Sequence, residues 1–153
     1  MVWANPIPVS VVLVPVTDAE RTGLLVVRRA IEPRRGLLAL VGGFLEAHET
    51  WAAGGVREIR EETGIVVEPA TLEPFWFASS EPKTDRVLLF SVAAPLDVAR
   101  LETFRPSPET SERGLVFGPN GLEELFAFPR HAEAARRFFA ARGISGPSDY
   151  RQA

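Results

Sequence analysis

The sequence predicts a mixed α/β domain in which helices pack on a mixed β-sheet. Apolar, β-branched runs precede and follow one central helical pattern, so the order is strands, helix, strands, helix. The length of 153 residues fits a single domain spanning residues 1–153. An apolar fraction of 46 % is close to the average for globular domains and is enough for a sizeable core.

The first half of the chain opens with two apolar strands. Residues 9–16 read Val-Ser-Val-Val-Leu-Val-Pro-Val, and residues 23–27 read Gly-Leu-Leu-Val-Val. Such runs are rich in strand-forming residues, and their near-continuous apolar character is typical of strands covered on both faces. By the same criteria, further strands are expected at 37–41, at 66–67 continuing through 75–77, at 87–93 and at 115–117.

Three segments carry helical patterns, at residues 50–63, 121–126 and 130–142. The last is amphipathic, because its Ala and Phe residues recur at helical spacing with Arg and Glu between them. The polar stretches 79–86 and 106–114 are expected to be loops. The tail from residue 143 contains Gly, Pro and Ser and is expected to be mobile.

The composition limits the chemistry that the chain can perform. The absence of Cys excludes disulfides, a thiol nucleophile and a Cys-ligated metal, and two His, His48 and His131, argue against a His-rich metal site. Any metal must therefore be held by oxygen, and carboxylates must carry the acid–base chemistry. The formal net charge of −3 gives no reason to expect a nucleic acid polymer as partner. With neither an export signal nor a membrane-spanning stretch visible, a cytoplasmic location without membrane attachment is expected.

The helix expected at 50–63 places three carboxylates on one side near its end. Glu58, Glu61 and Glu62 are three or four residues apart, whereas the core side is formed by Ala52, Val56, Ile59 and Thr63. Like charges at this spacing repel by about 0.2–0.5 kcal/mol, and each carboxylate at a helix C-terminus costs about 0.3–1 kcal/mol. The Gly54-Gly55 pair is expected to weaken this helix further.

A divalent cation would turn that repulsion into attraction. Clustered carboxylate oxygens suit hard ions such as Mg²⁺ or Mn²⁺. The alternative is a solvated acidic face that is paired with Arg57 and Arg60 and binds no metal.

The surrounding residues form a longer pattern, G-x5-E-x7-R-E-U-x-E-E-x-G-U, in which U is a bulky aliphatic residue. It is matched by Gly43, Glu49, Arg57, Glu58, Ile59, Glu61, Glu62, Gly64 and Ile65. The segment resembles the signature of the Nudix hydrolase family. The resemblance implies an α/β/α sandwich with a mixed β-sheet, and hydrolysis of the diphosphate linkage in a nucleoside diphosphate joined to another group.

The same resemblance implies that Glu58 and Glu62 are metal ligands, with Glu61 as a further ligand or as the residue that holds a water molecule at the metal. Mg²⁺ is the expected ion, with Mn²⁺ as the alternative.

Other residues of the pattern have a physical interpretation. The Gly42-Gly43 pair permits a sharp turn and leaves a carbonyl free to face the ion, and Gly64 can end the helix in the left-handed conformation. Glu49 is placed to pair with Arg57, which would orient the neighbouring carboxylates.

Two further sets of residues are candidates for the chemistry and for the substrate. The base that accepts a proton from water is expected to be Glu61 or, as the resemblance to diphosphatases with an additional loop Glu implies, Glu112, with Glu109 as second choice outside the pattern. The candidates for substrate contacts are Arg28, which could clamp a diphosphate, Phe44, which could stack on a base, and Glu46.

The leading hypothesis is an enzyme that acts on a small nucleotide, with ADP-ribose or a nucleotide sugar as first guess. The alternatives are a nucleoside triphosphate diphosphatase, which shares the pattern, and a non-catalytic regulator with the same fold that binds nucleotides. A homodimer is compatible with all three hypotheses.

Overall fold

The computed structural model describes residues 4–153. Its strands are β1 (Ile7–Leu13), β2 (Pro15–Asp18), β3 (Arg21–Arg29), β4 (Leu38–Phe44), β5 (Glu73–Ser79), β6 (Arg86–Val92), β7 (Leu96–Asp97), β8 (Thr110–Phe117) and β9 (Asp149–Gln152). Its helices are α1 (Trp51–Thr63), α2 (Leu122–Leu125) and α3 (Pro129–Ala141), with short 3₁₀ helices η1 (Pro69–Thr71) and η2 (Val98–Arg100).

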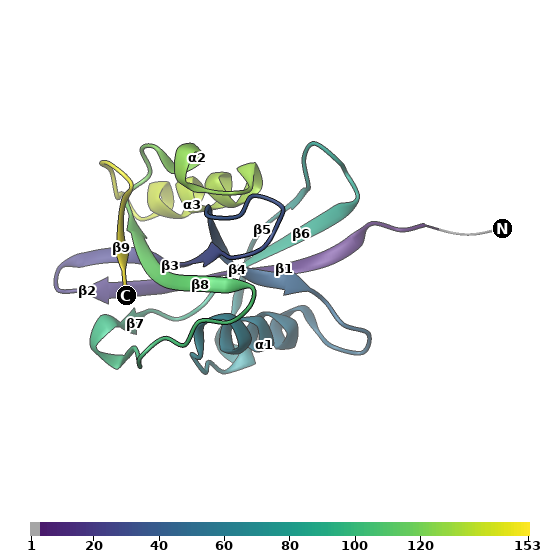
Figure 1. Cartoon of the computed structure of the whole chain (residues 1–153), viewed down its shortest axis with the longest axis horizontal. Coiled ribbons are helices and arrows are strands. Elements are labelled where there is room, and N and C mark those ends of the chain that lie inside the picture. Colours follow the sequence, from purple (N-terminus) through teal and green to yellow (C-terminus); the bar gives the residue numbers. More distant parts are fainter. Residues whose placement is uncertain (1–3) are drawn as a thin grey trace.

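The strands form one mixed sheet with helices on both faces (Figure 1). Its order is β5-β6-β1-β4-β3-β2-β7, and β8 pairs with both β3 and β9. The β1–β6 and β2–β7 pairs are parallel, whereas the other pairs are antiparallel. Helix α1 covers one face, and α2 and α3 cover the other. The predicted α/β/α sandwich with a mixed sheet is therefore confirmed.

Two apolar clusters join these three layers. On the α3 side, Leu24, Val26 and Leu40 pack with Phe138 and Phe139. On the α1 side, a second cluster joins residues of β1, β2, β3, β4 and β8 to the helix, among them Val12, Leu25, Val41, Leu115 and Ile59. Successive strand residues point to opposite faces, which explains why the central strands are apolar on both. None of the helices within residues 4–153 combines the length and the apolar character needed to cross a bilayer.

The predicted strand 9–16 is wrong in its continuity, because the chain divides into β1 and β2 at Val14. Pro15 has no N–H to donate to a ladder, and β2 pairs with β3 and β7 rather than with the neighbours of β1. The predicted strand at 66–67 is also wrong. Val66 is exposed and no strand pairs with it, so β-branched residues alone did not make a strand there.

Two segments expected to be irregular form strands instead. Residues 110–114, predicted as part of a loop, belong to β8 and pair with β3. Their polar residues resemble a loop in sequence, although Thr110 and Arg113 are buried in the folded chain. The tail from residue 143, expected to be mobile, contains β9, which pairs with residues 114–117 of β8. The segment has no apolar pattern of its own, but its backbone hydrogen-bonds to the open edge of β8, and this pairing holds it in place.

Helix α1 has a defined start and end. The Thr50 hydroxyl accepts a hydrogen bond from the Ala53 amide, and Gly64 ends the helix with φ = 79°, as predicted. The glycine pair inside it serves close packing. A Cβ on Gly54 would overlap the Leu45 side chain, and one on Gly55 would lie 2.8 Å from Val12 Cγ2. The helix therefore approaches β1 and the loop before it more closely than a helix with side chains at these positions could.

Candidate active site

Two glutamates of α1 meet the end of β4. The Gly42 amide points toward Glu62 Oε1, with 3.4 Å between N and O. At the next residue, a Cβ on Gly43 would overlap the carboxylate of Glu58, whose side chain is only 14 % exposed. A glycine is therefore required at position 43 for the carboxylate to lie against the strand. The predicted Gly42-Gly43 element is thus in contact with both carboxylates through its backbone.

The Glu58–Glu62 pair is electrostatically unfavourable on its own. Burial raises the pKa of Glu62 well above its usual value, and the neighbouring charge of Glu58 raises it further. Burial also raises the pKa of Glu58, although the hydrogen bond from Arg57 acts in the opposite direction. Two such carboxylates are stabilised when a proton or a cation lies between them.

Arg57 connects most of the acidic residues around this pair. Its guanidinium donates to both carboxylate oxygens of Glu49, at 2.7 and 3.0 Å, so the predicted Glu49–Arg57 contact is present. It also donates to Glu58 at 2.9 Å and to the Phe44 carbonyl at 3.1 Å. These hydrogen bonds lower the pKa of Glu49 to about 2 and raise that of Arg57. The loop before α1 is thereby attached to the helix.

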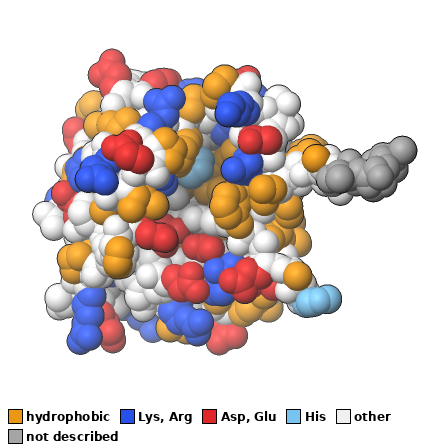
Figure 2. All heavy atoms as spheres, turned by 45° about the vertical axis from the view of Figure 1, so that its right-hand side comes forward, with side chains coloured by type: hydrophobic (Ala, Val, Ile, Leu, Met, Phe, Trp, Pro, Cys, Tyr) orange, Lys and Arg blue, Asp and Glu red, His pale blue; other side chains and the backbone are white. Residues whose placement is uncertain are grey.

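Glu61 and Glu46 lie at the solvent side of this cluster. Their side chains are 53 % and 68 % exposed and lie 3.2 and 3.8 Å from Arg57. The charge of Glu109, in a segment distant in sequence, adds a smaller contribution to the raised pKa of Glu62. Figure 2 shows acidic side chains gathered around a hollow on this face, with hydrophobic side chains beside them.

The donor set at this cluster fits a hard divalent cation. Glu58 and Glu62 offer partly buried carboxylate oxygens whose mutual repulsion a cation would relieve, and the backbone of Gly42-Gly43 adjoins them. Within residues 4–153, no three acidic or histidine side chains already stand in metal-ligating geometry. In the present arrangement Glu58 and Glu61 are instead turned toward Arg57.

Glu112 belongs to a different cluster, on the sheet face covered by α3. Alternate residues of β3 lie on the same face of the sheet, and Leu24 and Val26 face α3. Arg28, two residues after Val26, therefore lies on that face too. Its Nε lies 2.9 Å from Glu112 Oε1, and the Tyr150 hydroxyl donates to Glu112 Oε2 at 2.5 Å. The hydrogen bond from Tyr150 and the charge of Arg28 lower the pKa of Glu112.

Burial raises the pKa of Tyr150 to about 12, and the hydrogen bond to Glu112 and the charge of that carboxylate act in the same direction, whereas Arg28 opposes them. Arg28 and Glu112 are therefore in contact with each other. Glu112 also contacts Tyr150, a residue of the tail that was not among the predicted site residues.

Phe44 is available to a ligand. Its side chain is 54 % exposed although it follows directly on Gly43, and the guanidinium of Arg86 lies 5.1 Å from its ring centroid. The register β4–β1–β6 places Phe44 opposite Val9, which in turn lies beside Leu88. An aromatic and partly apolar surface therefore adjoins the carboxylate cluster.

Two buried polar residues near the site were not recognised from the sequence. His131, for which both a structural and an exposed position were open, is buried, and its Nδ1 accepts a hydrogen bond from the Leu40 amide at 3.1 Å. Arg113 is 3 % exposed and donates to three backbone carbonyls. Neither has a distinguishing sequence signal, because His131 begins an ordinary amphipathic helix and Arg113 lies among polar residues.

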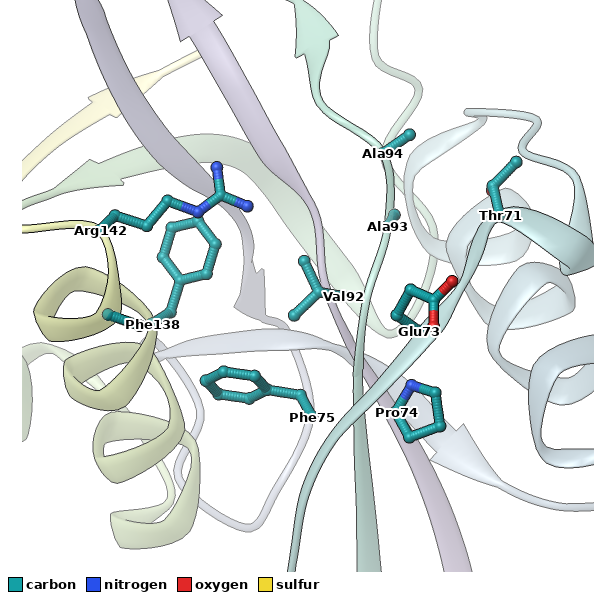
Figure 3. Close-up of a pocket in the computed structure, with 10 residues that line it drawn as sticks. Thr71, Glu73, Pro74, Phe75, Val92, Ala93, Ala94, Phe138 and Arg142 are labelled. Atoms are coloured by element: carbon teal, nitrogen blue, oxygen red, sulfur yellow. The ribbon is translucent and has the colours of Figure 1, made fainter.

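Two open cavities lie elsewhere, and neither is lined by Glu58 or Glu62. One of about 360 Å³ lies between β5, β6 and the end of α3, where Phe75, Val92 and Phe138 form its apolar part (Figure 3). The other, of about 630 Å³, lies beneath the segment 101–106 and includes Phe104 and Arg113.

Comparison with known proteins identifies the family. The profile of the NUDIX domain matches residues 6–141. An ADP-ribose pyrophosphatase of Methanocaldococcus jannaschii is 37 % identical over 75 residues, which are 49 % of this chain and 43 % of that protein. The match thus spans less than half of the archaeal protein.

Solved structures with 18–19 % identity share the fold. The NUDIX domain of Shewanella oneidensis NrtR, in complex with ADP-ribose, superposes with a TM-score of 0.69 over 90 % of each chain. A bifunctional NMN adenylyltransferase/ADP-ribose pyrophosphatase from Francisella tularensis, in complex with AMP and a Mn ion, gives a TM-score of 0.67 over 92 % of this chain and 42 % of that one.

Proposed function

The chain belongs to the NUDIX family as a Nudix hydrolase, and we propose that its reaction is the Mg²⁺-dependent hydrolysis of the diphosphate linkage in ADP-ribose or a closely related nucleoside diphosphate derivative. The observation that carries this proposal is the partly buried Glu58–Glu62 pair against the backbone of Gly42-Gly43. Such a pair is costly for the fold unless a cation is bound there during function.

The metal site is assigned to Glu58 and Glu62, with Glu61 and the Gly42 carbonyl as further oxygen donors. When bound, Mg²⁺ would neutralise the phosphate oxygens and increase the acidity of the attacking water. Arg57 and Glu49 keep the loop and the helix together, so that the carboxylates stay in place during binding. Mn²⁺, the ion in the Francisella tularensis complex, is the alternative to Mg²⁺.

Three carboxylates remain candidates for accepting the proton from water. Glu109 is exposed, and its charge contributes to the raised pKa of Glu62. Glu61 is next to the pair but lies within 3.2 Å of Arg57. Glu112 has both oxygens engaged by Arg28 and Tyr150, which lowers its basicity. We therefore assign the base to Glu109, the second choice of the sequence analysis.

The substrate contacts are assigned on both sides of this cluster. Phe44 and Arg86 offer a flat surface for a nucleobase, since aromatic rings and guanidinium groups both stack on planar ligands. Arg28 remains a candidate for the diphosphate, although it would have to exchange its contact with Glu112 for one with phosphate. Glu46, whose side chain is largely exposed, is left as a candidate for hydroxyl groups of the substrate.

A substrate panel tests the proposal. The wild-type protein is incubated with ADP-ribose, nucleotide sugars, dinucleotides and nucleoside triphosphates at several Mg²⁺ and Mn²⁺ concentrations, and released AMP and diphosphate are measured. We expect AMP from ADP-ribose, with activity lost on chelation of the metal.

A matched pair of variants assigns the activity to the site. Glu62→Gln should lower kcat by at least about 100-fold because it removes a metal ligand, whereas Glu68→Gln, at an exposed position beyond α1, should retain activity. Diphosphate release from triphosphates alone would support a triphosphate diphosphatase instead. Binding of ADP-ribose without turnover would support a regulator.

A further inference from the structure

Arg113 is a charged side chain in an unusually buried position. Among residues 4–153 it is the one arginine that is buried as a whole residue, with 3 % exposure. Its neighbour Leu115 is an ordinary apolar residue of the same sheet face. Removing a guanidinium from water costs several kcal/mol unless its donors are satisfied, so a role beyond filling space is expected of it.

The guanidinium joins three segments that are distant in sequence. Its Nη1 donates to the Thr63 carbonyl at 3.0 Å, Nη2 to the Glu102 carbonyl at 2.7 Å, and Nε to the Ala153 carbonyl at 3.0 Å. Thr63 is the last residue of α1 and follows Glu62 directly. Carbonyls at a helix C-terminus lack intrahelical partners and carry partial negative charge, which a guanidinium complements.

The second of these contacts lies at the start of the segment that carries Glu109. Between Glu102 and Glu109 the chain forms no helix or strand, and a cavity of about 630 Å³ lies beneath residues 101–106. Packing contacts lie near the start of this segment, where Leu101 lies against the apolar cluster on the α1 side and the Arg113 guanidinium lies 5.6 Å from the Phe104 ring centroid. Its far end is held because the Glu109 carbonyl accepts from the Ala30 amide at 2.8 Å, and the Ser107 hydroxyl accepts from the Glu109 and Thr110 amides.

We propose that Arg113 is a positioning residue, which ties the segment bearing Glu109 to the C-terminus of α1 and so sets the separation between Glu109 and the Glu58–Glu62 pair. The proposal rests on the proposed function for its catalytic consequence. The structural part of the proposal, that Arg113 holds residues 102–110 to the end of α1, can be tested without measuring activity.

The catalytic test uses Arg113→Met and Arg113→Lys in the full chain, with ADP-ribose as substrate. Arg113→Met should lower kcat by roughly 10- to 100-fold with KM changed less than about threefold, because misplacement of a reacting group affects the chemical step more than ground-state binding. Arg113→Lys should recover part of kcat, since an ammonium can reach at most some of the three carbonyls. Arg100→Met, at an exposed position beside the segment, is the matched control.

A double-mutant cycle separates positioning from a merely structural role. If Arg113 acts through Glu109, Arg113→Met should cost little further kcat in a Glu109→Gln background. An equal loss in both backgrounds would overturn the proposal, as would an unchanged kcat accompanied by a lower Tm. Should Arg113→Met fail to fold, Ser107→Ala, which releases the far end of the segment, should lower kcat in the same non-additive way.

Hydrogen exchange tests the tether independently of turnover. Amides of residues 102–110 should exchange faster in Arg113→Met than in the wild type and in Arg100→Met. Unchanged exchange there would contradict the proposal even if kcat falls. A wild-type chain that turns over no nucleotide would contradict the proposed function instead, while the exchange data would still decide whether the tether exists.

Discussion

At the scale of single residues, the pairing of each carboxylate distinguishes the candidates for the base. Glu112 contacts a cation and a phenol, whereas Glu109 is exposed and its charge contributes to the raised pKa of Glu62. Since Arg28 and Tyr150 stabilise the charged form of Glu112, proton transfer to it is disfavoured. The sequence could place both residues near the site but could not show which partners each would find.

The two variants Glu109→Gln and Glu112→Gln test this assignment. Glu109→Gln should lower kcat by about 100- to 1,000-fold, within the range for a lost general base, and leave KM nearly unchanged. Glu112→Gln should lower kcat less than tenfold. Steady-state kinetics at saturating metal provide the measurement, and the reverse order of the two effects would return the role to Glu112.

Because His131 is buried, we expect the stability of the fold to depend on pH. Burial lowers its pKa to about 3 from 6.5, and protonation would also remove the lone pair that accepts the Leu40 amide. Below pH 6.5 the unfolded chain binds the proton first, so stability is lost as the pH falls from 6.5 toward 3. The loss from this group is up to about 1.4 kcal/mol per pH unit.

Urea unfolding between pH 7 and pH 4.5 measures this effect. His131→Gln should flatten the pH dependence over that interval, because glutamine can accept the hydrogen bond without titrating. His48→Gln, at an exposed position, should behave as the wild type. Equal slopes for the wild type and His131→Gln would show that another group is responsible.

At the scale of elements, α1 combines a sequence of low helix propensity with close packing against its neighbours. Its two glycines are poor helix formers, yet they are the positions at which the helix meets Leu45 and Val12. Close approach brings Glu58 and Glu62 to the backbone of β4. The prediction that the pair merely weakens the helix was incomplete, because propensity does not report what packs against a residue.

The substitution Gly54→Ala tests whether the gain in helix propensity or the cost of overpacking is larger. Helix propensity would gain about 0.5–1 kcal/mol, but overpacking against Leu45 and Glu49 costs about 1–3 kcal/mol, so we expect net destabilisation. Arg60→Ala, exposed on the same helix, should change the free energy of unfolding by less than about 0.5 kcal/mol. A Gly54→Ala protein more stable than the wild type would contradict the close packing.

At the scale of the whole molecule, the sheet carries two separate clusters of charged side chains. The end of β4 and helix α1 provide the carboxylate pair, while β8 and the tail provide Glu112 and Tyr150. The tail, paired with β8, therefore contributes to the cluster around Glu112 rather than ending as a mobile extension.

Metal binding should stabilise the entire fold. A cation that binds only the folded state at 100 times its Kd adds about 2.7 kcal/mol, which raises Tm by roughly 5–10 °C in a domain of this size. Glu62→Gln should lose most of this shift and have a higher Tm than the wild type without metal, since it removes one of two buried like charges. Glu68→Gln should keep the full shift. An undiminished shift in Glu62→Gln would place the cation elsewhere.

The sequence by itself determined the mixed α/β class, the position of α1 with the glycine that ends it, and the Glu49–Arg57 contact. These are local properties: apolar periodicity, a terminal glycine and residues a few positions apart all act over short stretches of chain. The same stretches could not predict that β1 ends at Val14, or that residues 110–114 and 149–152 are strands, because strand formation depends on the partner that each segment finds.

The tertiary structure alone decided the environment of the charged groups. Burial raised the pKa of Glu62, and the fold enclosed Arg113 among carbonyls, placed His131 beneath Leu40 and paired Glu112 with Arg28 and Tyr150. The physical reason is that pKa values and charge pairing depend on desolvation and on neighbours brought from distant segments. Local sequence carries information about neither.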